Sequence, residues 1–387
     1  MRVAVVAEYY PRAADPALGV WAHRQALAAR DAGAEVEVLV LHRPVPPLAT
    51  VRSRDLPALL EPLRQPLRAE LDGLRVTYVP FLAPPRPGAY GRWGAWAAPS
   101  LAVALRALRR RFPFDLVHAH YAAPAGDAVR RARVGVPLVV SVHGGDVLGV
   151  AERWPGGEQA VRAAFAAARV TLANSGAIAR RSEALGARDV RVVHLGTDLP
   201  EPVPHDPDTL VTVGNLVARK RHGDVARALW LLRDSHPHVR WVVAGDGPER
   251  APLARLAGEL GLDGRVELRG RVAPGEALAL ARRAGVFVLP SVEEAFGVAY
   301  IEAMAGGVPA IGARGEPGPE EIAACGGGMR LVPPGDPEAL ARELAALLDE
   351  PEWRRELGAA ARANVEAHFT WEQCGRATVA AYEDALR

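Results

Sequence analysis

Short apolar runs alternate along the chain with longer stretches in which apolar residues recur at helical spacing. The runs are rich in Val, Leu and Ile at consecutive positions, which is typical of parallel strands buried on both faces. Strands that alternate with helices predict an α/β fold built on doubly wound parallel sheets. The expected strands cover residues 3–7, 36–41, 76–79, 116–119, 138–142, 170–173, 190–194, 210–213, 239–244, 266–268, 286–289 and 308–311. The expected helices include residues 21–32, 97–111, 223–233, 276–284 and 371–386.

The alternation stops once and then restarts. Residues 199–207 contain four prolines, a composition typical of a linker. We therefore expect a first domain over residues 1–199 and a second over residues 208–370, facing each other across a cleft. Ligands of open α/β sheets bind at the carboxyl ends of the strands, so the cleft is the expected site. A last helix over residues 371–387 follows a break and can pack on either domain, the first included.

Composition excludes several classes of protein. Hydrophobic residues make up 49% of the 387 residues and charged residues 24%, which is enough for sizeable cores and excludes a disordered chain. A formal net charge of +2 excludes a polyanion binder held by bulk charge, so no nucleic-acid partner is expected. Cys325 and Cys374 are too few for a disulfide framework or a zinc site. With no apolar run of about 18 residues and no signal-peptide pattern, we expect a cytoplasmic protein.

The two halves of the chain differ in charge. Residues 1–200 carry 26 Arg and 17 acidic residues (+9), and the remainder carries 21 basic and 28 acidic residues (−7). Ordinary scatter is one explanation. The other is that the first domain faces something anionic, either a phosphate-bearing acceptor or the inner membrane surface, to which the protein would bind peripherally. The cluster of Arg106, Arg109, Arg110 and Arg111 would suit the second explanation.

The segment 290–306 carries the richest pattern of candidate chemistry. It follows an expected strand and opens a helix near Gly297, so free backbone N–H groups there form an anion site. Glu294 precedes the helix and Glu302 lies a little over one turn into it. Carboxylates accept hydrogen bonds from sugar hydroxyls, whereas amides suit phosphates. The helix dipole alone explains an acid before the helix, but it does not explain Glu302.

Two glycine turns follow expected strands at the start of the second domain. The first runs from Gly214 to Lys220, and the second begins at Gly245. A glycine turn with basic side chains can hold a diphosphate, but the Walker spacing is absent, and for the first turn alone a solvated basic turn is the better explanation. The second turn alone is an equally weak signal. Lys220 is, however, the only lysine among the 47 basic residues. Codon bias explains the arginines and leaves this exception open.

Histidines stand at the ends of two expected strands in the first domain. His118 and His120 close the strand at 116–119, and His143 follows the strand at 138–142. A buried, hydrogen-bonded imidazole is the simpler explanation for any one of them, and we favour it for His118. Three histidines at neighbouring strand ends are harder to explain in this way, and Asp146 follows within the same turn as His143.

Together these segments resemble family 4 of the retaining glycosyltransferases over nearly the whole chain. The family has the GT-B fold, with two Rossmann-like domains of which the first binds the acceptor and the second the nucleotide sugar. Glu294 and Glu302 match the two acids of its Glu-x7-Glu motif. Residues 214–220 are similar to its Gly-Arg-x4-Lys turn and residues 245–249 to its Gly-x-Gly-Pro-Glu turn. Residues 8–20 are similar to its N-terminal glycine loop. Residues 115–120 are similar to its Asp-x-x-His-x-His strand end and residues 143–146 to its His-Gly-x-Asp turn.

Three positions depart from the family pattern. Asn215 stands where an arginine is usual, which removes one charge from the phosphate pocket, although Arg219 can compensate. Ala295 replaces a frequent glycine, and Gly19 stands alone where two adjacent glycines are often found.

The resemblance implies transfer of a sugar from a nucleotide diphosphate sugar to an acceptor hydroxyl with retained configuration, in glycan, glycolipid or exopolysaccharide synthesis. No metal and no cofactor are implied beyond the nucleotide sugar co-substrate, and the unknown acceptor includes lipid-linked candidates. Lys220 and the amides at 296–298 would hold the diphosphate, Glu302 the ribose and Glu294 the donor sugar, with His143 near the reacting carbon. The catalytic residues are thus Lys220, Glu294 and His143. The donor-binding residues are Gly19, Asn215, Arg219, Gly245, Phe296, Gly297, Val298 and Glu302, and the acceptor-side candidates are His120 and Asp146.

Two other functions stay open. A nucleotide-sugar epimerase can share this two-domain fold, but it would need acid/base carboxylates at the sugar and no acceptor. A non-catalytic module that binds nucleotide sugars is the other, and the joint presence of Lys220, Glu294, Glu302 and His143 argues against it. The sequence reveals neither the sugar nor the base of the donor.

Overall fold

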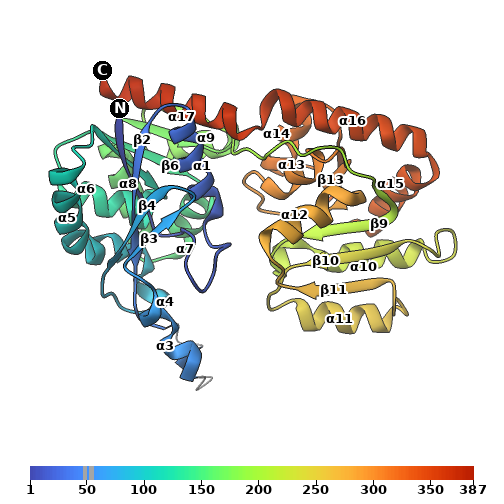
Figure 1. Cartoon of the computed structure of the whole chain (residues 1–387). Helices are drawn as coiled ribbons and strands as arrows, with labels where there is room; N and C mark the ends of the chain where they lie inside the picture. The colour runs from blue at the N-terminus through green and yellow to red at the C-terminus, as the bar shows by residue number, and fades with distance from the viewer. Residues whose placement is uncertain (47–49, 52–55) are drawn as a thin grey trace. The chain divides into compact units, whose positions relative to one another are not determined.

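A computed structural model of the chain describes residues 1–46, 50–51 and 56–387. The chain folds into two compact units, the first made of Met1–Leu195 with Trp371–Arg387 and the second of Gly196–Thr370. Each unit contains a sheet flanked by helices (Figure 1). Two α/β domains with predominantly parallel sheets are what the apolar pattern predicts. None of the described helices is long and apolar enough to cross a membrane.

In its described residues the first unit has an eight-stranded sheet with the order β3-β4-β2-β1-β5-β6-β7-β8. All neighbours pair in parallel except β3 and β4, which form a hairpin. The chain winds outward in opposite directions from β1 and β5, so the carboxyl ends of these two strands form the switch point at which α/β sheets bind ligands. The strands are β1 (Arg2–Ala7), β2 (Glu35–His42), β3 (Arg68–Leu71), β4 (Leu74–Pro80), β5 (Leu116–His120), β6 (Leu138–Val142), β7 (Val170–Ala173) and β8 (Val190–Val192).

Helices from both ends of the chain complete the core of the first unit. The last helix, α17, lies against α1 (Figure 1). Its Cys374, Ala381 and Tyr382 join a cluster that contains alternate residues of β1, because side chains alternate between the faces of a strand. The described helices are α1 (Val20–Asp31), α3 (Leu56–Arg64), α4 (Arg86–Ala89), α5 (Trp93–Arg111), α6 (Asp127–Ala132), α7 (Ala151–Arg153), α8 (Gly157–Ala167), α9 (Gly176–Ala184) and α17 (Trp371–Leu386).

The second unit has a six-stranded, all-parallel sheet with the order β11-β10-β9-β12-β13-β14. Its switch point lies between β9 and β12, whose carboxyl ends lead into residues 214–220 and 289–297. The strands are β9 (Asp206–Val213), β10 (Arg240–Ala244), β11 (Val266–Gly270), β12 (Ala284–Val288), β13 (Ala310–Ala313) and β14 (Met329–Val332). The helices are α10 (His222–Leu231), α11 (Arg250–Glu259), α12 (Pro274–Arg283), α13 (Val298–Met304), α14 (Pro317–Cys325), α15 (Pro337–Asp349) and α16 (Pro351–His368).

The structure differs from the expectation in three places. β3 and β14 were not expected, because each is only four residues long and is incompletely buried at the edge of its sheet. β9 begins at Asp206, within the proline-rich stretch, since Pro207 lies near the start of a strand, where its missing N–H is tolerated.

Candidate active site

In the second unit, the turn after β9 brings Lys220 onto the loop after β12. The ammonium group of Lys220 contacts the carboxylate of Glu294, and the guanidinium of Arg219 lies 3.6 Å from Glu294 Oε2. The backbone is tied as well, since Val292 N–H donates to the carbonyl of Arg219 at 2.8 Å. Only 12% of the Lys220 side chain and 10% of the Glu294 side chain are exposed. The structure therefore brings three of the expected site residues together, a largely buried pair of Lys220 and Glu294 with the partly exposed Arg219 beside it.

Residues that the sequence did not single out hold Glu294 in place. Ser291 Oγ donates to Glu294 Oε2 at 2.9 Å and lies 3.1 Å from the hydroxyl of Tyr300. The backbone N–H of Glu294 donates to Glu316 Oε2 at 3.1 Å. Ser291 stands three residues before Glu294 and Tyr300 lies within the Glu-x7-Glu motif, but Glu316 lies 22 residues beyond Glu294. Only the fold brings it to this loop.

The electrostatics of this group favour an ionised Glu294. Burial acts to raise the pKa of Glu294, but Lys220, Arg219 and the hydrogen bond from Ser291 outweigh it and hold the pKa below its usual value. The carboxylate is thus a ready hydrogen-bond acceptor. Lys220 has its charge balanced by Glu294 before any ligand binds.

The loop before α13 makes a sharp turn at Gly297, where φ is +90° and a Cβ atom would lie 2.4 Å from the Tyr300 ring. Phe296 is 1% exposed and its ring packs 5.7 Å from that of Phe369, so its backbone alone can face a ligand. The helix then runs only from Val298 to Met304. Its dipole is that of a short helix, and Lys220 and Arg219 add positive charge beside it. Glu302 is half-buried on the same helix.

The two glycine turns of the second unit pack against each other. Gly214 N–H donates to the carbonyl of Ala244 at 3.0 Å, and a Cβ atom on Gly245 would lie 1.9 Å from the Gly214 carbonyl oxygen. Gly245 is therefore needed for close backbone packing beneath the Lys220 turn. Asn215, in the same turn, is exposed.

In the first unit, three histidines line the switch-point side of β5 and β6. His120 Nδ1 lies 3.0 Å from His143 Nε2, and the two rings are stacked 5.3 Å apart. His118 is fully buried, with Nε2 2.7 Å from Ser141 Oγ and Nδ1 2.7 Å from the Tyr382 hydroxyl. The expectation of a satisfied buried imidazole at His118 is confirmed, and its partner Tyr382 on α17 is a contact that sequence spacing did not indicate.

All three imidazoles are held neutral. Burial lowers the pKa of His118, with His143 adding to the effect, and burial also lowers that of His143, each to about 3. Burial and the two neighbouring histidines lower the pKa of His120 as well. Within the described residues, the buried atoms His120 Nε2 and His143 Nδ1 have no hydrogen-bond partner. His143 can therefore donate or accept a hydrogen bond without carrying charge.

Asp146 is placed beneath the histidine loop and is 0% exposed. Its carboxylate accepts hydrogen bonds from the backbone N–H of Ala122 at 3.1 Å and of His143 at 3.2 Å. Burial raises the pKa of Asp146 to about 6, with the backbone amides acting against it. Asp146 is thus a positioning residue for the backbone of His143. It offers no surface to an acceptor.

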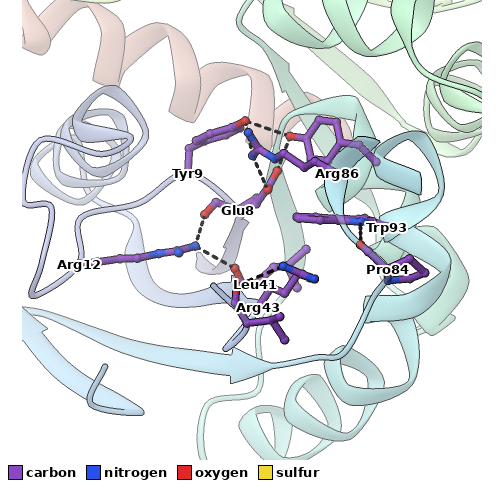
Figure 2. Close-up of polar contacts among 10 residues, drawn as sticks. Glu8, Tyr9, Arg12, Leu41, Arg43, Pro84, Arg86 and Trp93 are labelled. Carbon is purple, nitrogen blue, oxygen red and sulfur yellow. Dashed lines mark hydrogen bonds and ion pairs between the residues drawn. The ribbon is translucent and has the colours of Figure 1, made fainter. Parts of the chain in front are cut away.

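Gly19 belongs to the first unit, whereas the other expected donor-binding residues lie in the second. It has a φ of +64° just before α1, and a Cβ atom there would lie 2.2 Å from the backbone of Tyr9. Close by, at the carboxyl end of β1, Glu8 and Tyr9 contact Arg86 and Tyr90 in a polar cluster that the sequence analysis did not identify (Figure 2).

Comparison with known proteins identifies both halves of the chain. Residues 18–201 match the model described as Glycosyltransferase Family 4, and residues 199–364 match that of Glycosyl transferases group 1. A D-inositol 3-phosphate glycosyltransferase of Streptomyces scabiei is 32% identical over 70% of this chain and 68% of its own length. One from Streptomyces bingchenggensis is 31% identical over 77% of this chain and 70% of its own length.

Solved structures with low sequence identity share the fold. Sucrose-phosphate synthase from Thermosynechococcus elongatus superposes with a TM-score of 0.77 at 23% identity, covering 99% of this chain and 98% of its own. Anabaena HepE in complex with UDP and glucose has a TM-score of 0.73 at 19% identity, covering 99% of both chains. Both likenesses show the GT-B architecture. With relatives above 30% identity that align over more than two thirds of their length, the chain belongs to family 4 of the glycosyltransferases and is a glycosyltransferase of the group 1 type.

Proposed function

We propose that the protein transfers a sugar from a nucleotide diphosphate sugar to an acceptor hydroxyl, with retention of configuration and without a bound metal. The observation that carries this proposal is the buried contact between Lys220 and Glu294, at the carboxyl ends of the neighbouring strands β9 and β12. In a chain of this family, such a pair offers a cation that can stabilise a leaving diphosphate. Beside it lies a carboxylate that can accept hydrogen bonds from the hydroxyls of the donor sugar. The UDP and glucose named with Anabaena HepE support a donor of this chemical class.

In this proposal the second unit holds the donor. Lys220, with Arg219 beside it, stabilises the negative charge that develops on the leaving diphosphate, and such stabilisation is often the largest catalytic contribution. The backbone amides at 296–298 add hydrogen bonds to the same group. Because Glu294 is ionised and held by Ser291, it accepts hydrogen bonds from the donor sugar, while Glu302 on α13 holds the ribose.

The first unit supplies His143 near the reacting carbon. His143 is neutral, and His120 and the Asp146-bound backbone fix its position. No side chain acts as a nucleophile. The bond between the anomeric carbon and the diphosphate oxygen breaks, the acceptor oxygen bonds to the same face of the sugar, and the acceptor proton passes to the departing phosphate.

A donor screen tests this function directly. A thermal-shift panel of UDP, GDP, ADP and their sugars identifies the nucleotide, and the stabilising donor is then incubated with and without acceptor alcohols. We expect transfer with the anomeric configuration of the donor, measured by NMR, and unchanged rates in EDTA. An altered sugar nucleotide formed without acceptor would instead identify an epimerase. A product of inverted configuration, or loss of transfer in EDTA, would overturn the mechanism.

Peripheral contact of the basic first half with an anionic membrane is a separate part of the proposal. Flotation with anionic and neutral liposomes at low salt tests it. We expect binding to the anionic vesicles alone, and the absence of binding to either would overturn this part.

A further inference from the structure

Three arginines gather at one edge of the first unit's sheet, and together we call them the guanidinium cluster: Arg12, Arg43 and Arg86. Arg12 follows β1, Arg43 follows β2 and Arg86 begins α4, after β4. Since β1, β2 and β4 are parallel neighbours, their carboxyl ends meet at this edge. Figure 2 shows the three side chains in one group with Glu8.

Glu8 balances one of the three positive charges. Arg86 donates to Glu8 Oε1 at 3.0 Å, and the hydroxyl of Tyr90 donates to Glu8 Oε2 at 2.6 Å. Glu8 is 5% exposed, whereas 44% of the Arg86 side chain is exposed. Both carboxylate oxygens are therefore engaged inside the protein, while the guanidinium that they bind still reaches the surface.

Arg12 and Arg43 bind neutral partners instead. Arg12 Nη2 donates to the carbonyls of Glu8 at 3.2 Å and Leu41 at 3.4 Å (Figure 2). Arg43 donates to the carbonyls of Ala83 at 2.9 Å and Val45 at 3.1 Å. Carbonyl groups fix these side chains without neutralising them. In the described part of the chain, the buried Arg12 Nε has no hydrogen-bond partner.

Burial acts to lower the pKa of Arg86, but Glu8 outweighs it and raises that pKa above its usual value, so the electrostatically unfavourable members of the cluster are Arg12 and Arg43. Burial lowers the pKa of Arg12, Glu8 acts against this, and Arg86 lowers it further. Burial likewise lowers the pKa of Arg43, and Arg86 again adds to the effect. Like charges that repel one another in a partly dehydrated place are stabilised when an anion binds among them.

Aromatic rings fix the directions of two of the guanidinium groups, those of the exposed Arg86 and the half-buried Arg43. Arg86 lies over the Tyr90 ring at 4.4 Å and Arg43 over the Trp93 ring at 5.3 Å. The Trp93 ring is itself held by a hydrogen bond of 3.0 Å to the Pro84 carbonyl. Guanidinium groups that are stacked in this way keep their planar forks oriented, and such forks match the oxygens of phosphate and carboxylate groups.

We infer that the guanidinium cluster binds an anionic group of the acceptor, and that this group is a phosphate. The inference rests on the proposed function, because the bound molecule is an acceptor only if the chain transfers a sugar. Three guanidinium groups against one contacting carboxylate leave two positive charges, which match a phosphate monoester dianion better than a singly charged carboxylate. The cluster lies at the end of β1, whose Ala7 is in register with His120 of β5, and in a different unit from Lys220.

Titration of the whole protein with inorganic phosphate tests the cluster without any turnover. Calorimetry at constant ionic strength would compare wild type with Arg12→Gln, Arg43→Gln, Lys220→Ala and the matched control Arg180→Gln, an exposed arginine of α9. We expect binding to weaken roughly tenfold or more in the two cluster variants, and to persist in the other two. Wild-type affinity in both cluster variants, or loss of all binding in Lys220→Ala, would overturn the inference.

A second measurement uses only the wild-type protein, so it does not depend on how the variants fold. Phenylglyoxal modifies accessible arginines, and peptide mass spectrometry reports the modification at each one. Phosphate should protect Arg43 and Arg86 several-fold and leave Arg180 unprotected. Equal labelling with and without phosphate would overturn the inference.

Acceptor competition separates this inference from the proposed function. Glucose, glucuronic acid and glucose 6-phosphate serve as acceptor probes of neutral, singly and doubly charged type. We expect the phosphorylated probe to be preferred at least tenfold, and Arg43→Gln to reduce that preference. Equal use of the three probes would overturn the cluster's role and leave transferase activity standing. If neither transfer nor donor hydrolysis occurs, the proposed function fails, and the role of the cluster in binding a sugar acceptor fails with it. The phosphate titration still decides whether the cluster binds the anion.

Discussion

The ammonium group of Lys220 contacts the carboxylate of Glu294 in a place where about nine tenths of both side chains are shielded from water. Each charge therefore depends on the other for its compensation, with Arg219 at 3.6 Å as a secondary partner of the carboxylate. Removing one partner of a buried pair costs more than removing both, because the survivor stays buried and unpaired.

Lys220→Ala should consequently lower both stability and turnover. We expect the free energy of unfolding of the second unit to fall by about 3 kcal/mol, since a buried carboxylate is left with weaker compensation. Transfer should fall by roughly 100-fold or more with the loss of the diphosphate cation. The double variant Lys220→Met/Glu294→Gln should recover much of the stability and none of the activity.

Urea unfolding and transfer rates, measured together, check this prediction. Arg355→Gln, at a position 68% exposed in the second unit, is the control and should change neither quantity appreciably. Equal stability of the single and double variants would mean that the pair does not couple in the way described.

Lys220→Arg separates charge from shape. The positive charge is kept, so stability should change by less than about 1 kcal/mol. The planar guanidinium fork replaces a compact ammonium group between Glu294 and the proposed diphosphate, and we expect at least a tenfold loss of kcat. Steady-state kinetics decide the matter, because wild-type turnover in this variant would mean that codon usage alone accounts for the single lysine.

The buried histidines of the first unit should make it sensitive to acid. His118 and His143 have pKa values of about 3 against an ordinary value of 6.5, so the unfolded chain takes up protons that the folded chain does not. The contribution of each histidine is intact above pH 6.5 and is lost as the pH falls from 6.5 towards 3, by up to about 1.4 kcal/mol per histidine per pH unit. Asp146, whose pKa burial raises to about 6, acts in the opposite direction between pH 6 and 4 and offsets part of this loss.

His118→Gln should flatten this dependence, because one of the protons that the histidines take up on unfolding is no longer involved. Urea unfolding at several pH values between 7.5 and 4.5 would show the difference between wild type and variant shrinking as the pH falls. His238→Gln is the matched control, since that side chain is exposed and in the second unit. A constant difference at every pH would contradict the assignment of neutral, buried histidines.

Gly245→Ala tests whether the two glycine turns must touch. A methyl group there would lie 1.9 Å from the Gly214 carbonyl oxygen, at a φ of +151°. We expect a loss of about 3 kcal/mol or more in stability and a displaced Lys220 turn. Gly258→Ala, in helix α11 with open space around it, should instead stabilise the unit by roughly 0.5–1 kcal/mol. Thermal melting of the two variants should therefore shift in opposite directions.

The apolar pattern predicted most strands of the two sheets, because these sheets are mainly parallel and are buried on both faces. It missed β3, whose turn to β4 is the pair Asp72-Gly73 with positive φ at both positions. An Asp-Gly pair between two short strands is a strong hairpin signal, but the amphipathic stretch before it drew no strand prediction. It also missed β14, which has only four residues and a mixed burial pattern.

For the candidate site, local motifs indicated the candidate residues but not the residues that hold them in place. Lys220 and Glu294 stand in recognisable turns that follow parallel strands, and the structure shows their side chains in contact where those strand ends meet. Glu316 at the Glu294 backbone and Tyr382 at His118 come from distant segments, and no short-range pattern announces them. Asp146 looked like a ligand group by its place beside His143, and only its burial reveals that it binds backbone instead.

The position of α17 has a consequence for how the protein is made. Residues 1–195 leave the ribosome before residues 371–387, which belong to the same unit. The core of this unit therefore lacks Cys374, Ala381 and Tyr382 until residues 371–387 have been translated. The second unit lies wholly within the stretch synthesised in between. The unit that begins first is therefore finished last, and during synthesis the hydroxyl that binds His118 is absent until the intervening unit has already emerged.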